Sequence, residues 1–121
     1  MKILKTLLAC SLIAFAGQSF ANTTPIKFAK GSYCGSFTGN YANRTFTLGL
    51  GKGQTLLING NEGAGVDGAK DIIVKGPNGK TLPYDGQDYG QWIVRTTGKH
   101  TIKIIPYSPR DAYSSIEFCA Y

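Results

Sequence analysis

The side chains that could do chemistry are few in this sequence, and they stand far apart. His100 is the only histidine, so a serine triad or a zinc site would depend on this one imidazole. Its place at the start of an alternating run is typical of a half-exposed structural residue. No Gly-x-Ser-x-Gly elbow, which displays the nucleophile of many hydrolases, is present. We therefore expect no enzyme activity, no metal ion held by nitrogen or sulfur, and no cofactor.

Oxygen ligands remain possible, because aspartates in loops can bind calcium. Asp85 and Asp88 form one such pair, and Asp67 and Asp71 form another. Aromatic residues that could stack on a sugar ring stand close to the first pair; they are Tyr84, Tyr89 and Trp92. These residues define one functional hypothesis, a glycan- or calcium-binding module.

The N-terminus has the layout of a secretory signal peptide. A short positively charged start precedes the apolar run Leu7–Ala16, and Ser19-Phe20-Ala21 fits the small-x-small pattern of a cleavage site. The run is too short to span a bilayer comfortably. We expect residues 1–21 to be removed and residues 22–121 to form one domain. A lipoprotein is the alternative, because Leu7–Cys10 resembles a lipobox.

Removing that segment leaves 121 − 21 = 100 residues, enough for one small domain. Two lysines go with it, so 11 basic residues face 7 acidic ones and the formal charge falls from +6 to +4. The basic residues are scattered along the sequence, which argues against nucleic-acid binding. Cys34 and Cys119 remain, and an even count in an exported domain predicts a disulfide. Closing 119 − 34 = 85 residues could stabilise the fold by roughly 4–5 kcal/mol.

The clearest structural pattern lies between Arg44 and Ile58. Alternation of Phe46, Leu48 and Leu50 with small or polar residues predicts a strand with one apolar face. Gly51–Gln54 supplies a turn, and a second β-rich run follows it. The stretch therefore predicts a β-hairpin at the centre of the core.

The rest of the domain consists of short β-like runs between turn signals, with no amphipathic helix. The expected runs include Ile26 with Phe28, Tyr33–Thr38 ended by Gly39-Asn40, Asp71–Lys75, Gln91–Arg95, His100–Ile105, and a last strand in which Ile116, Phe118 and Ala120 share a face. The expected fold is all-β, a small antiparallel β-sandwich of about eight strands with one disulfide. Cys34 and Cys119 should join the second run to the last.

An ordered set of short motifs spans nearly the whole mature chain. The set comprises Lys30-Gly31, Gly35 and Gly39, Thr45-Phe46-Thr47, Gly51-Lys52-Gly53-Gln54, Asn61-Glu62-Gly63-Ala64, Gly90-Gln91-Trp92 and Thr97-Gly98-Lys99. In this order the motifs resemble those of the bacterial periplasmic inhibitors of goose-type lysozyme. The resemblance implies a β-sandwich that plugs the substrate groove of a lysozyme. It also implies a periplasmic protein that has a protein partner and no membrane contact once the signal is removed.

The resemblance also implies which residues bind the enzyme. The family's aromatic residue just after the second glycine corresponds to Tyr41, with Asn40 beside it. The family's arginine-bearing loop before the last strand is shorter here, with Arg110 as its one arginine, Asp111 beside it and Tyr113 close by. Glycosidases depend on carboxylates, and a guanidinium can bind a carboxylate bidentately. If these residues form one site, Tyr41 and Arg110 must lie at the same end of the sandwich.

Overall fold

A computed structural model describes residues 22–61, 63–83 and 90–121. The predicted signal peptide, residues 1–21, lies outside the described residues. The same holds for Tyr84, Asp85, Asp88 and Tyr89 of the hypothetical glycan or calcium site. In the described part, no helix has the length and apolar character needed to cross a membrane.

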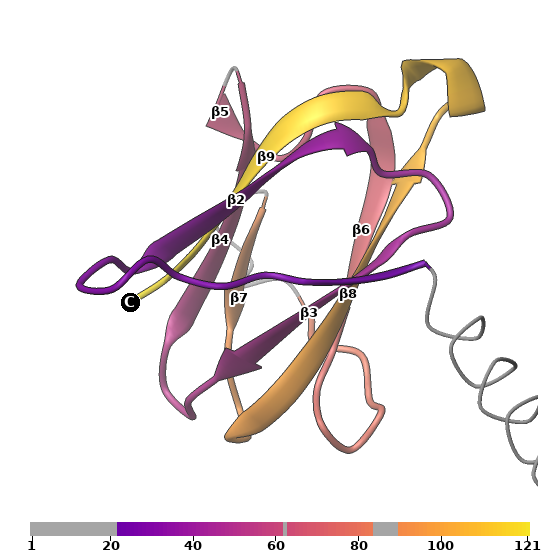
Figure 1. The fold of residues 1–121 in the computed structure, drawn as a ribbon. Coiled ribbons are helices and arrows are strands. Elements are labelled where there is room, and N and C mark those ends of the chain that lie inside the picture. Colours follow the sequence, from indigo (N-terminus) through magenta and orange to yellow (C-terminus); the bar gives the residue numbers. More distant parts are fainter. Residues whose placement is uncertain (1–21, 62, 84–89) are drawn as a thin grey trace, which may run out of the picture.

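Two packed sheets form a sandwich (Figure 1). The first sheet has the order β1 (Thr23–Pro25), β3 (Thr45–Leu50), β8 (Gly98–Pro106) and β6 (Ala69–Lys75). The second has the order β2 (Cys34–Asn40), β9 (Tyr113–Ala120), β4 (Thr55–Gly60) and β5 (Gly63–Ala64), and β7 (Gln91–Ile93) also pairs with β4. The pairing of β1 with β3 is parallel and the other strand pairs are antiparallel. The predicted all-β sandwich is confirmed.

Side chains that alternate along the strands fill the space between the sheets. Phe46 from the first sheet lies 5.1 Å from the ring of Phe118 in the second, and 4.9 Å from that of Phe37. The predicted faces are correct for the central strands and for the last strand. The buried members are Phe46, Leu48, Leu50, Leu56, Ile58, Ile116, Phe118 and Ala120. Both sheets therefore contribute to one core, because a period of two residues turns one face of each sheet inward.

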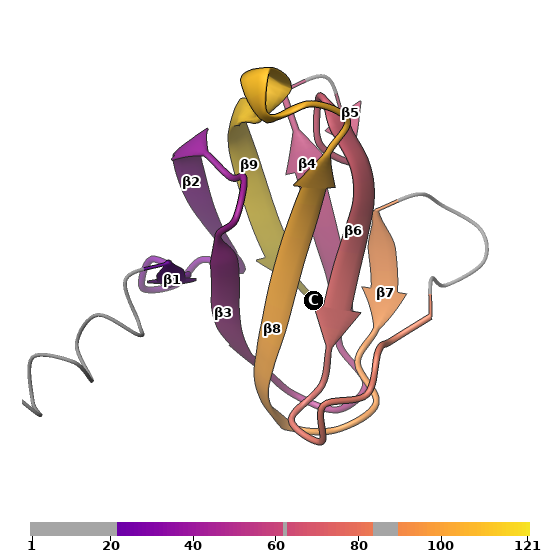
Figure 2. The same ribbon diagram turned by 90° about the vertical axis from the view of Figure 1, so that its right-hand side faces the viewer.

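The predicted central hairpin is wrong in its pairing. β3 pairs with β8 in the first sheet, whereas β4 pairs with β9 in the second. The turn between them, closed by Gln54 N donating to Gly51 O at 3.1 Å, carries the chain from one layer to the other (Figure 2). Alternation shows which face of a strand is buried, but it does not identify the strand's neighbour. An arch between layers and a hairpin within one layer bury the same residues.

Several smaller expectations also need correction. The first strand is Thr23–Pro25, before the predicted Ile26 and Phe28, and β2 continues through Gly39 to Asn40. Between the central stretch and the predicted run Asp71–Lys75, the chain forms the short strand β5, and β6 begins at Ala69, two residues before that run. His100, expected to be half-exposed, is 0% exposed. Its ring points inward because Lys99 and Thr101 occupy the outward positions on either side.

The predicted disulfide is confirmed. Cys34 on β2 and Cys119 on β9 are bonded to each other, and the two residues are direct partners in the antiparallel register. The bond therefore staples the second run to the last strand. It also links the first residue of β2 to the end of β9, two positions that are 85 residues apart in the sequence.

Candidate functional site

A short 3₁₀ turn, η1 (Pro109–Asp111), stands at one end of the sandwich between β8 and β9 (Figures 1 and 2). Ser108 caps it, because its hydroxyl accepts from Arg110 N at 3.4 Å and its carbonyl accepts from Asp111 N at 2.9 Å. Proline at the first position fits the fixed φ that such a turn needs. The result is a defined turn on which the side chains of Arg110 and Asp111 are exposed.

The turn between β2 and β3 lies at the same end. Asn40 Oδ1 accepts from Ala42 N at 2.9 Å, and Arg44 N donates to Tyr41 O at 3.3 Å. Asn43 adopts φ 57°, a left-handed conformation that asparagine tolerates better than most residues. The Arg44 guanidinium makes intramolecular contacts, because it donates to Thr24 Oγ1 at 2.6 Å and lies 5.0 Å from the Phe37 ring centroid.

Tyr41 is buried beneath these two turns and links them. Its side chain is 0% exposed, and its backbone N–H donates to Ala112 O at 2.8 Å. Its hydroxyl donates to Asp67 O at 2.9 Å and lies 3.5 Å from Asp111 O. Tyr41 therefore holds three chain segments together, namely the β2–β3 turn, the segment before β6, and η1.

Gly68 makes this close approach possible. It has φ 76°, and a Cβ atom there would collide with Asp111 O and come within 3.3 Å of Tyr41 Oη. Its own carbonyl accepts from Tyr107 N at 2.9 Å, so the segment before β6 also positions the residue that leads into η1. A glycine is thus required both for its backbone angle and for the space beside it.

The structure places Tyr41 and Arg110 at one end of the sandwich, as the hypothesis requires. It does not, however, leave Tyr41 free to contact a partner, because a fully buried ring offers no surface in this conformation. The residue acts as a support for η1. Asn40, Arg110, Asp111 and Tyr113 are all exposed, and their contact with a partner remains a prediction.

An aromatic residue that the sequence-based site omitted stands close to η1. Tyr107 is 75% exposed and Tyr113 is 70% exposed, and the two residues flank η1 along the chain. The sequence did contain a signal for Tyr107, because this tyrosine lies in the loop before the last strand and outside any alternating pattern. Exposed tyrosines beside an exposed arginine are a combination enriched at protein interfaces.

A hollow of about 360 Å³ adjoins the candidate site. It lies between the β2–β3 turn and the end of β8 with the start of η1. Its lining consists of Ala42, Asn43, Lys103, Ile104, Ile105, Pro106 and Pro109. The largely apolar wall with one amine and one amide could accept a side chain of a partner protein.

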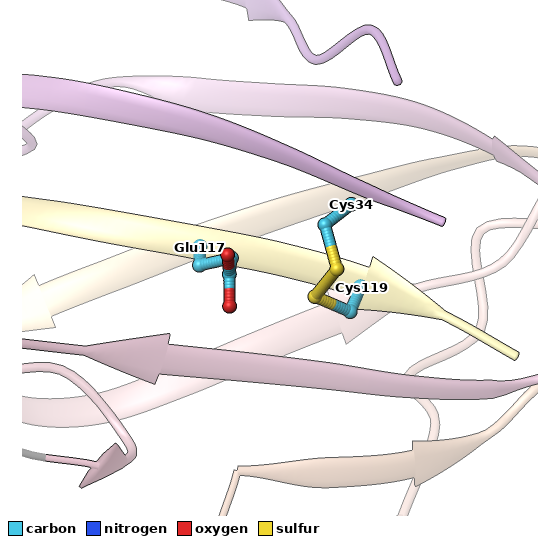
Figure 3. Close-up of side chains that lie close together, drawn as sticks. All are labelled: Cys34, Glu117 and Cys119. Carbon is cyan, nitrogen blue, oxygen red and sulfur yellow. A yellow bond between two sulfur atoms is a disulfide. The ribbon is translucent and has the colours of Figure 1, made fainter. Parts of the chain in front are cut away.

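One group of possible metal ligands comes together in the described residues, and it cannot serve. Cys34, Glu117 and Cys119 place their ligand atoms within 4.8 Å of one another (Figure 3). Both sulfur atoms are consumed by the disulfide, so neither is a thiolate that could bind a metal ion. Glu117 is then the one possible ligand left in this group, and a single exposed carboxylate does not make a metal site.

The described residues lend no support to the glycan- or calcium-binding module. Trp92 is 1% exposed because β7 turns it into the core, so it cannot form an open stacking platform. In the second aspartate pair, Asp71 Oδ1 accepts from Ile72 N at 2.9 Å, and within the described residues neither Asp67 nor Asp71 belongs to a group of three or more possible metal ligands.

No protein-family model and no curated protein matches the sequence. Among the solved structures that are similar to it are two inhibitors of lysozyme. The crystal structure of Salmonella Typhimurium PliG, a periplasmic lysozyme inhibitor of g-type lysozyme, is 21% identical, with a TM-score of 0.60 over 84% of this chain and 99% of that chain. A mutant of the Escherichia coli PliG inhibitor is 20% identical, with a TM-score of 0.53 over 82% of this chain and 97% of that one. This chain therefore has the fold of these inhibitors, which confirms the fold that the sequence resemblance implied.

Proposed function

We propose that this chain is a periplasmic inhibitor of g-type lysozyme that inserts its η1 end into the enzyme's substrate groove. The shared fold with two such inhibitors supports the proposal. The observation that carries it is the construction of the η1 end, where a buried tyrosine fixes a turn bearing an exposed arginine between two exposed tyrosines.

Arg110 is the charged element of the proposed contact. A muramidase groove contains essential carboxylates, and the planar guanidinium can donate two parallel hydrogen bonds to one of them. Burying this pair at an interface excludes water from both groups, so the loss of one partner is typically costly. Asp111, beside it, can accept hydrogen bonds from donors on the enzyme.

Tyr107 and Tyr113 supply the contact area of the proposed interface. A tyrosine ring buries a large apolar surface while it immobilises few rotatable bonds, and its hydroxyl can still find a polar partner. Asn40 adds an amide at the edge of the same surface. The hollow lined by Ala42 and Pro109 could receive a side chain of the enzyme.

Rigidity is what the support by Tyr41 would contribute to inhibition. A loop that already holds its bound conformation loses little conformational entropy on association, and this raises affinity without any new contact. The capped η1 turn, the bonded β2–β3 turn and the close approach at Gly68 all reduce that loss. The inhibitor would therefore block the groove as a preformed wedge.

The proposed compartment fits the chemistry of the chain. A disulfide persists outside the reducing cytoplasm, and the predicted signal peptide would direct residues 22–121 to the periplasm, where the two similar inhibitors are described. A lysozyme that attacks peptidoglycan would be met in the same compartment.

The test is a lysis assay with purified residues 22–121 and goose-, chicken- and invertebrate-type lysozymes. We expect inhibition of the goose-type enzyme and little effect on the other two. Direct titration by calorimetry should give a one-to-one complex. A protein that is folded and disulfide-bonded but leaves all three enzymes fully active would overturn the proposal.

A further inference from the structure

The outward-facing residues of β3, β8 and β6 form a surface that meets the proposed lysozyme contact only at the hollow beside η1, where Lys103 and Ile105 are part of the lining. Figure 2 looks onto these three strands, which lie side by side in front of the second sheet. Their inward residues belong to the core, and the alternation leaves Lys75, Lys99 and Lys103 pointing outward and exposed. We call this surface the basic face.

The strand register brings these lysines together. Lys103 lies between Thr45 of β3 and Ile73 of β6, and in the next outward row Thr101 lies between Thr47 and Lys75. Lys75 and Lys103 are thus diagonal neighbours on adjacent strands, a separation that long side chains can span. Lys99 opposes Gly49 in the following row, where no side chain covers it.

A shallow hollow of about 160 Å³ lies between the two diagonal lysines. Thr45 and Thr101 contribute hydroxyl groups to its wall, and Ile73 contributes an aliphatic side. Two ammonium groups and two hydroxyl donors around one small space suit an oxyanion of the size of phosphate. The amines act as point charges, so they select for negative charge more than for a particular geometry.

Charged side chains are distributed unevenly between the outer faces of the two sheets. Asp71 is the one acidic residue at an outward position of β6, and its Oδ1 accepts from the adjacent Ile72 N. On the outer face of the second sheet, the outward positions of β2 and β9 carry Glu117 and no lysine or arginine. Positive charge is therefore concentrated on one layer, which favours an anionic partner for that layer.

The neighbours of the lysines distinguish between anionic partners. Proteins that track single-stranded nucleic acids place aromatic rings beside their basic residues, whereas the outward residues of β3, β8 and β6 include no aromatic residue. Half-buried Ile73 and Ile105 stand among the lysines instead. Aliphatic side chains flanked by lysines suit the boundary between lipid headgroups and acyl chains.

We propose that the basic face binds the surface of an anionic phospholipid membrane, with one headgroup phosphate in the hollow between Lys75 and Lys103. This does not rest on the lysozyme proposal, because the basic face belongs to one layer of the sandwich and not to the η1 turn. It departs from the absence of membrane contact that the sequence resemblance implied. The interaction would hold the protein reversibly at the membrane, since a few lysines provide only modest and salt-sensitive attraction.

The experiment is flotation of residues 22–121 with vesicles at low salt, using phosphatidylcholine alone and phosphatidylcholine with roughly one-third phosphatidylglycerol. We expect binding to the anionic vesicles only, reversed by added salt. The triple variant K75Q/K99Q/K103Q should lose roughly 100-fold in apparent affinity. The charge-keeping variant K75R/K99R/K103R should bind like the parent, and T101V should bind several-fold more weakly.

The matched control is K27Q/K30Q/K52Q, which removes the same charge from exposed lysines outside β3, β6 and β8. It should retain most of the binding. An equal loss in both triple variants would reduce the effect to net charge and overturn the assignment. So would binding to neutral vesicles, or tighter binding of a soluble acidic polysaccharide or nucleic acid that K75Q/K99Q/K103Q also abolishes. Melting curves would verify that every variant is folded.

Discussion

Two pairs of exposed tyrosines stand at opposite ends of β9 and the strands beside it, and they differ in what their rings contact. Tyr33 and Tyr121 lie beside the disulfide, with ring centroids 5.8 Å apart and the Tyr121 hydroxyl 4.0 Å from Cys34 Sγ. Tyr107 and Tyr113 instead flank η1 and its exposed Arg110. The first pair covers a covalent staple. The second pair borders a turn whose construction keeps it rigid.

The contrast shows that exposure alone does not identify a binding residue. All four tyrosines expose more than half of their surface, yet the pair beside the disulfide has a structural explanation and the pair beside η1 has none. We therefore expect changes at the disulfide end to alter stability and changes at the η1 end to alter inhibition. Four experiments can break or sharpen this division.

The largest expected effect comes from removing the disulfide. The double variant C34A/C119A should be less stable by up to about 4–5 kcal/mol, because the unfolded chain is no longer constrained. Urea unfolding of this variant and of the parent would measure the difference. At temperatures where the variant is still folded, it should inhibit goose-type lysozyme like the parent. A folded variant without inhibition would show that the two ends are coupled.

The next effect is confined to the η1 end. Arg110→Ala should weaken lysozyme binding by roughly 30-fold or more, because removing one partner of a buried interfacial ion pair typically costs about 2–5 kcal/mol. Arg110→Lys should recover part of the loss, because an ammonium group cannot form the planar bidentate contact. Neither change should alter the melting temperature, because the side chain is exposed.

Arg95 provides the control for charge in that experiment. It is exposed and lies after β7, beside the turn Gly76–Gly79 at the other end of the first sheet. Arg95→Ala changes the net charge by the same amount and should leave inhibition unchanged. Equal inhibition by the Arg110 and Arg95 variants would make Arg110 a spectator.

A smaller effect is expected from the tyrosine pairs themselves. Y107A/Y113A should weaken binding by about tenfold or more, because truncated tyrosines at the centre of an interface commonly cost above 1 kcal/mol each. Y33A/Y121A should leave binding intact and lower stability by about 0.5–1.5 kcal/mol through loss of the ring contact. Binding titrations and unfolding curves of both variants would decide. The reverse pattern would assign the disulfide end to recognition.

The smallest effect tests the support beneath η1. Tyr41→Phe removes the hydroxyl that donates to Asp67 O and should cost about 1 kcal/mol of stability, since a partly buried hydrogen bond is lost. Inhibition should fall less than in Arg110→Ala, because the ring still fills its place. Hydrogen exchange at Asp111 and Ala112 would show whether η1 opens more often. Unchanged exchange with unchanged stability would remove Tyr41 from its supporting role.

Short-range physics explains what could be predicted from the sequence. Alternation along Thr45–Leu50 and along the last strand set which side chains are buried, because the β period is two regardless of the partner strand. The even cysteine count after removal of the predicted signal indicated the disulfide, and the ordered motifs indicated the fold. The family resemblance pointed to the residues that the structure brings to the η1 end, with the exception of Tyr107, and their contact with a partner stays a prediction.

Long-range contacts decided the rest. The sequence does not show that β3 and β4 belong to different sheets, because the choice depends on which distant strands, β8 and β9, reach each edge. Tyr41 is of a residue type that is common at protein interfaces, and it is the packing of Gly68 and η1 against it that buries it. Lys75, Lys99 and Lys103 are scattered in sequence, and the antiparallel register of β6 with β8 gathers them on one face. Burial and charge density are properties of neighbours in space, and chain order by itself does not determine those neighbours.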